Sequence, residues 1–176
     1  MNCILIIGAA PCAPEDIRHA AEIIRHAGED YHVMCIGKTA SAVHKPDCKY
    51  LATYHPVQLP EIRAQRAADG CNTDYIVIAH ETKWPEVAIS LPLQPGERSG
   101  SSALLGALAA LREGYTRIIL CGCPMTGKNA NGGDYDTFQI GWRNKQKFLN
   151  DRVRSMSGWT RELLGAPTDE WLTEAR

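Results

Sequence analysis

The sequence predicts a single α/β domain with a mainly parallel sheet of about five to six strands flanked by helices. Short, continuously apolar runs recur along the 176-residue chain, and such runs are typical of strands buried on both faces. Segments with helical character alternate with these runs, as crossover connections between parallel strands require. Each main run is followed directly by a glycine or a histidine, where a loop is expected to begin.

Five apolar runs are predicted to form the sheet, and a sixth, shorter strand is expected at Val87–Leu91. This sixth run lies in a long loop from His80 to Arg98, where prolines and glycines leave no clear period. Ligands bind outside the carboxyl ends of the strands in such sheets, so the loops after the main runs are the expected functional surface. The five main runs are Cys3–Ile7, Tyr31–Ile36, Tyr50–Tyr54, Tyr75–Ala79 and Arg117–Cys121.

Four segments are predicted as helices. The third is rich in Ala and Leu and apolar almost all round, so we expect it to be buried. The fourth is predicted as one long C-terminal helix, with Ser157-Gly158 as the place where it could break. The four segments are Glu15–Ala27, Leu59–Ala68, Ser101–Glu113 and Gln139–Leu164.

Together these elements predict a Rossmann-like domain over residues 1–165 and a C-terminal tail at 166–176 with one further helical turn. The long C-terminal helix carries an apolar stripe that includes Trp142 and Phe148. Such a stripe packs on the sheet or on a second copy of the chain, so a homo-oligomer formed through this helix is one expectation.

The charge balance indicates that the molecule as a whole is not an electrostatic nucleic-acid binder. Lys and Arg number 19 and Asp and Glu 20, giving a formal net charge of −1, so binding to nucleic acid would require a local basic patch. The apolar N-terminus, Met1–Gly8, lacks a basic region and is too short for a signal sequence. No run approaches the ~20 apolar residues that span a bilayer. We therefore expect a cytoplasmic protein without a membrane partner.

Seven cysteines stand at irregular spacings, and several lie within predicted core strands. This pattern predicts reduced thiols without a disulfide. Cys121 and Cys123 form the one close pair, and a zinc site would need two further ligands at suitable spacing. The sequence therefore predicts no metal site, and it indicates no particular cofactor.

The first loop, from Gly8 to Cys12, joins a predicted strand to a predicted helix. A glycine here lets the backbone turn sharply and approach a phosphate, and the first such loop of this architecture is the usual phosphate loop. Ala10 stands where the dinucleotide-binding fingerprint has its second glycine. Two interpretations therefore stay open, a phosphate loop and a simple turn.

Ser101 and Ser102 precede the third helix. Either hydroxyl can cap the helix, and the free N–H groups of a helix start can also bind an anion. We expect this helix start and the first loop to face each other across one cleft.

The segment Gly122–Lys128 fits the first seven positions of a P-loop. Asn129 stands where that motif requires Ser or Thr, and the glycines and asparagines that follow cannot start the helix that holds the phosphates. The pattern therefore favours an ordinary loop over a P-loop.

His55 and His80 each follow a predicted strand directly. A histidine at this edge can act as a general base or bind phosphate, and it can also merely stabilise its loop. As candidate catalytic residues, both are expected to border the cleft.

Two segments, taken together, resemble a known group of Rossmann-like proteins. They are Leu5–Cys12 (LIIGAAPC) and Gly100–Met125 (GSSALLGALAALREGYTRIILCGCPM). The pair resembles motifs shared by small bacterial sialyltransferases and by the 6-hydroxymethylpterin pyrophosphokinase (MptE-like) domain. Many phage and prophage proteins of unassigned function share it as well. Cys12 stands where the group has a serine, and Pro124 stands where it has an acidic residue.

In that group the two motifs line a nucleotide site, which holds CMP in the sialyltransferases. The resemblance thus implies that the partner is a nucleotide or a nucleotide sugar. It places the nucleotide-binding residues at Gly8, Pro11, Cys12, Gly100, Ser101 and Ser102.

Two function hypotheses follow. In the first, the chain is a nucleotide-dependent transferase, of the glycosyltransferase or pyrophosphokinase kind, and His55 or His80 activates an acceptor hydroxyl. In the second, it is a non-catalytic binding or accessory protein of the phage or prophage type, with a degenerate nucleotide site. Pro124 in place of an acid favours the second hypothesis, and Gly100-Ser101-Ser102 favours the first.

Overall fold

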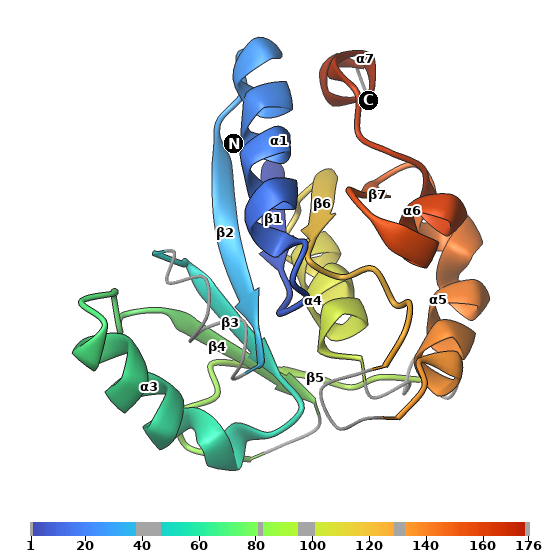
Figure 1. Cartoon of the computed structure of the whole chain (residues 1–176). Helices are drawn as coiled ribbons and strands as arrows, with labels where there is room; N and C mark the ends of the chain where they lie inside the picture. Colours follow the sequence, from blue (N-terminus) through green and yellow to red (C-terminus); the bar gives the residue numbers. More distant parts are fainter. Residues whose placement is uncertain (1, 38–46, 81–82, 95–100, 129–132, 175–176) are drawn as a thin grey trace.

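The computed structural model describes residues 2–37, 47–80, 83–94, 101–128 and 133–174. In this part of the chain, seven strands form one sheet in the order β5-β4-β3-β2-β1-β6-β7, and every neighbouring pair is parallel (Figure 1). The strands are β1 (Cys3–Ile7), β2 (Tyr31–Ile36), β3 (Tyr50–Thr53), β4 (Ile76–His80), β5 (Ile89–Leu91), β6 (Arg117–Cys121) and β7 (Val153–Ser155). The predicted parallel α/β sheet is confirmed, with seven strands instead of five to six.

Helices cover both faces of the sheet (Figure 1). Successive side chains of a strand point to opposite faces, so Ile6 packs with α4 and α5 while Leu5 packs with α1 and α7. The helices are α1 (Ala13–His26), α3 (Leu59–Ala68), α4 (Ser102–Arg112), α5 (Asp136–Leu149), α6 (Gly158–Leu164) and α7 (Asp169–Thr173), with a short 3-10 helix η1 (Pro56–Gln58) before α3. The third predicted helix, α4, is buried over most of its length, as expected.

The prediction of one long C-terminal helix is wrong. Strand β7 lies between α5 and α6 and pairs with β6, where Val153 is opposite Ile118 and Ser155 is opposite Leu120. The β-branched Val153 is fully buried at this sheet position. Pairing with β6 therefore outweighs the helical continuation that the sequence pattern predicts.

The segment predicted as a C-terminal tail contributes to the core. Its helix α7 buries Trp171 and Leu172 against the apolar cluster beneath α1. The Trp171 indole N–H donates to the carbonyl of Asp151 at 3.0 Å, and the Arg117 guanidinium lies 5.1 Å from the indole ring centroid. None of the helices in the described ranges is long and apolar enough to cross a bilayer.

All seven cysteines are free thiols in the structure. Only Cys12 and Cys71 are half-buried, and the other five are buried. Burial raises the pKa of Cys12, and it raises the pKa of Cys3 to about 12. Reactivity requires both access and a thiolate.

We expect iodoacetamide to modify Cys12 and Cys71 in the native protein, and the remaining five thiols only after unfolding. Mass spectrometry of peptides after timed alkylation without reductant measures this order. Rapid native labelling of Cys121 would contradict the burial of β6, and a thiol count below seven after unfolding would reveal a disulfide.

Candidate functional site

The strand order reverses at β1. The chain passes from β1 outward through β2 to β5 and returns to β6 on the other side of β1. A crevice opens at such a switch point, between the loops that leave the carboxyl ends of the two strands that meet there, β1 and β6. Here the two loops are held together, because the Gly8 N–H donates to Cys121 O at 2.8 Å and the Ala10 N–H donates to Gly122 O at 3.2 Å.

Two glycines make this close approach feasible. A Cβ added to Gly8 would lie 2.2 Å from the carbonyl oxygen of Gly122 and 2.6 Å from the Cys123 sulfur. Gly122 has a φ of +65°, and a Cβ there would lie 2.4 Å from the Ala13 Cβ. A larger residue at either position would separate the loops, since protein interiors leave no room for such overlap.

A cavity of about 750 Å³ lies beside these loops. Its walls come from the first loop, the start of α4, the loop after β6, the start of α5 and the residues that open α6. Of the predicted nucleotide-binding residues, those in its wall are Gly8, Pro11, Cys12, Ser101 and Ser102. Gly100 lies outside the described residues. The first loop and the start of the third predicted helix therefore share one cleft, as expected.

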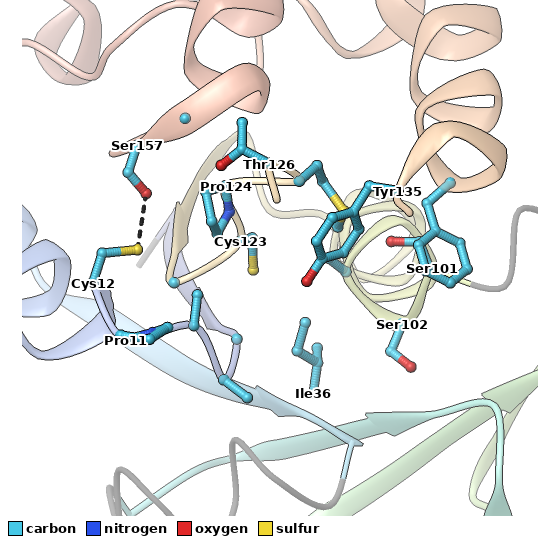
Figure 2. A pocket seen from close by; sticks show the side chains of 18 of the residues that line it. Pro11, Cys12, Ile36, Ser101, Ser102, Cys123, Pro124, Thr126, Tyr135 and Ser157 are labelled. Atoms are coloured by element: carbon cyan, nitrogen blue, oxygen red, sulfur yellow. Dashed lines mark hydrogen bonds between the residues drawn. The ribbon is translucent and has the colours of Figure 1, made fainter. Parts of the chain in front are cut away.

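The start of α4 presents hydrogen-bond donors to the cavity. Ser101 caps the helix, because its Oγ accepts from the Leu104 N–H at 3.3 Å and its side chain is buried. Ser102 also lines the cavity, at the start of α4 (Figure 2). The N–H groups of Ser102 and Ala103 belong to the first turn, where a helix supplies no internal partner. Both the capping role and an anion-binding surface are thus compatible with this helix start.

An aromatic wall closes another side of the cavity. Tyr135 and Phe138 pack with ring centroids 5.8 Å apart and an interplanar angle of 58°. Burial raises the pKa of Tyr135, so its phenol stays protonated at neutral pH. The Gln139 side chain donates to Met125 O at 3.0 Å and ties this wall to the loop after β6. Flat aromatic surfaces of this kind stack against planar ligands.

Lys128 lies at the rim of the cavity and pairs with Asp134 at 2.7 Å. Both side chains are about two-thirds exposed, at 65% each, so this ion pair contributes little stability. The next helix, α5, begins at Asp136. Residues 129–132, where the helix of a P-loop would begin, lie outside the described residues, so the preference for an ordinary loop over a P-loop stays a prediction.

A polar cluster lies on the side of the cavity away from Ser101 and Ser102 (Figure 2). The Ser157 hydroxyl donates to the Asp16 carboxylate at 2.7 Å, and the Gly122 N–H donates to the same oxygen at 2.8 Å. The Cys12 sulfur lies 3.4 Å from the Ser157 oxygen. Asp16 is only 7% exposed, so the cluster holds a carboxylate just behind the cavity wall.

No family model matches the chain, and a search of the curated proteins finds no match to it. The resemblance to the sialyltransferase and MptE-like group therefore stays a prediction.

The prediction that His55 and His80 border the cleft is wrong, since neither is among the described residues that line the cavity. His55 is exposed and precedes η1, and its backbone N–H donates to the Thr53 hydroxyl. The His80 ring lies 5.5 Å from that of Tyr54, and its Nδ1 is 3.3 Å from Leu91 O. His55 follows β3 and His80 is the last residue of β4, whereas the cavity opens beside β1 and β6.

Sequence reasoning misses the aromatic wall and the Asp16–Ser157 contact. Asp16 lies in the first turn of α1, where an acidic residue already has an explanation in the helix dipole. Ser157 is 141 residues away along the chain. Tyr135 and Phe138 follow a glycine- and asparagine-rich stretch, and only the fold brings them to the cavity. Within the described ranges, no three His, Cys, Asp or Glu side chains are grouped to hold a metal ion.

Proposed function

We propose that this protein binds a nucleotide or a nucleotide sugar in the cavity beside β1 and β6. One observation carries the proposal: a single cavity combines the donor-rich start of α4 with an aromatic wall. A nucleotide needs both features, because it joins an anionic phosphate to a planar base. The cavity volume of about 750 Å³ is in the range typical of small-molecule sites.

In this proposal the phosphate lies at the start of α4. The N–H groups of the first turn and the partial positive charge of the helix end favour an anion there. The Ser102 hydroxyl supplies a further donor. The small residues of the first loop allow a phosphate to approach the backbone closely.

The base lies against Tyr135 and Phe138 in the same proposal. Base–aromatic stacking contributes roughly 1–3 kcal/mol per base and tolerates every base. The proposal therefore commits to a nucleotide and leaves the identity of the base to the binding screen below.

The geometry favours binding over group transfer by His55 or His80. Transfer to an acceptor hydroxyl needs a base within hydrogen-bond reach of that hydroxyl. His55 and His80 are not among the described residues of the cavity wall. This observation favours the binding or accessory role over a transferase that uses either histidine.

A thermal-shift screen tests the proposed function. The panel contains nucleoside mono-, di- and triphosphates and nucleotide sugars, with nucleosides and inorganic phosphate as matched controls. A ligand at about 100 times its dissociation constant stabilises the native state by ~2.7 kcal/mol, which raises Tm measurably. We expect at least one nucleotide to raise Tm more than its nucleoside or phosphate alone. If no nucleotide in the panel does so, the proposed function is wrong.

A further inference from the structure

The hydrogen bonds of the polar cluster have a defined direction. The Ser157 hydroxyl donates to the Asp16 carboxylate, so its one hydrogen is committed there. The contact between Cys12 and Ser157 must then be donated by the thiol, because the serine has no second hydrogen to give. The order is Cys12 S–H to Ser157 oxygen, and Ser157 O–H to Asp16.

The position of Ser157 in the fold supports this assignment. It is the N-cap residue of α6, where a serine side chain ordinarily accepts from the helix backbone, yet its side chain makes no capping bond. The helix is instead tied to the loop after β6 by Thr160, whose hydroxyl donates to Cys123 O at 2.7 Å. Ser157 is therefore held by Asp16 at the cavity wall and does not serve to cap its own helix.

The two sides of the cavity therefore offer a ligand different hydrogen-bonding groups, donors on one side and an acceptor on the other. At the start of α4 it finds donors, which suit a phosphate. At Ser157 it finds an oxygen that can only accept, with one lone pair left beside the Cys12 contact and the buried Asp16 carboxylate behind it. An anion placed at Ser157 would be repelled by that carboxylate, whereas a neutral hydroxyl can donate to the serine oxygen.

We propose that Ser157, oriented by Asp16, accepts a hydrogen bond from a ribose hydroxyl of the bound nucleotide. This inference rests on the proposed function. It makes the ligand a ribonucleotide in preference to a deoxyribonucleotide, with its phosphate at α4 and its ribose toward α6. Ser157 is the residue that determines this specificity, and Asp16 is a positioning residue that acts through it.

Calorimetric titration tests this specificity. The probes are the ribonucleotide that gives the largest thermal shift and its 2′-deoxy and 3′-deoxy forms. We expect the wild-type protein to bind the ribonucleotide about tenfold more tightly than one of the two deoxy forms, the usual size of one hydrogen bond. The Ser157→Ala variant is expected to bind both forms with the affinity that the wild type shows for the deoxy form.

Two substitutions of Asp16 test the positioning role. Asn keeps a carbonyl oxygen that can accept from Ser157 and Gly122, so Asp16→Asn should retain most of the preference for ribose. Asp16→Ala leaves the Ser157 hydroxyl without its acceptor and free to rotate, so the preference should fall toward that of Ser157→Ala. A structural role alone would lower Tm in the alanine variant and leave the ratio of affinities unchanged.

The outcomes separate the two proposals. A wild-type protein that binds the ribonucleotide and both deoxy forms equally, or a Ser157→Ala variant that keeps the wild-type ratio, overturns the role of Ser157 and leaves the proposed function intact. If the variants do not fold, equal binding of the three forms by the wild type still overturns the role of Ser157. Absence of nucleotide binding to the wild type overturns the proposed function and this inference together.

Discussion

Replacement of Ser102 by aspartate is expected to weaken nucleotide binding by roughly 30- to 100-fold. A carboxylate at this position would lie within about 6 Å of the bound phosphate, where like charges repel by about 2–3 kcal/mol at an effective dielectric constant near 20. An acidic residue in the first turn favours the helix dipole, so the fold should be preserved. Calorimetric titration of the variant with the nucleotide found in the screen measures the loss.

Ser102→Asn is the matched control, since asparagine has the size of aspartate and no charge. We expect this variant to lose no more than about threefold in affinity, with Tm values of both variants close to the wild type. Equal losses in the aspartate and asparagine variants would indicate a steric effect. That result would contradict a phosphate at the start of α4.

Replacement of Gly8 by alanine is expected to lower the free energy of unfolding by about 3 kcal/mol or more. The added Cβ would overlap the carbonyl oxygen of Gly122 and the sulfur of Cys123. The Gly122 backbone can move out of the way only if β1 and β6 separate. The loss in free energy of unfolding therefore lies at the upper end of the range for overpacking substitutions. Urea unfolding followed by circular dichroism measures the change through the transition midpoint and its slope.

Gly70→Ala provides the comparison for this substitution. Gly70 has a φ of +73°, but a Cβ there meets no atom within 4 Å. Its replacement should cost only the strain of a left-handed backbone, about 1–2 kcal/mol. If Gly8→Ala lowered the free energy of unfolding no more than Gly70→Ala, the loops after β1 and β6 would not be in such close contact.

The parallel sheet could be predicted because strands such as β1 and β6 are almost entirely apolar. Every residue of β1 and β6 is buried, and apart from Arg117 both strands consist of apolar residues, so each forms a short hydrophobic run in the sequence. The strand β7 could not be predicted in the same way. Three residues, Val153–Ser155, are too few to show a strand period, and their partner β6 lies more than 30 residues earlier in the chain. Sheet pairing with a distant strand therefore overrides the local helical pattern.

One side of the candidate site could likewise be predicted from the sequence, and the other side could not. The first loop and the start of α4 could be predicted because each follows directly from a recognisable strand or helix. The opposite side of the cavity depends on packing between distant segments, such as Asp16 with Ser157. The sequence pattern predicts His55 and His80 at the cleft because each stands at the end of a predicted strand. A strand end alone does not place a residue at the switch point between β1 and β6.

Protection of Cys12 from alkylation tests the central claim, nucleotide binding in this cavity, most directly. Cys12 lines the cavity, whereas the other half-buried thiol, Cys71, is not among the residues of its wall and serves as an internal reference. We expect a saturating nucleotide to slow iodoacetamide labelling of Cys12 about tenfold or more and to leave the labelling of Cys71 unchanged, because bound ligand removes access to the thiol. A nucleotide that raises Tm yet leaves the labelling rate of Cys12 unaltered would place its binding site elsewhere and contradict the account.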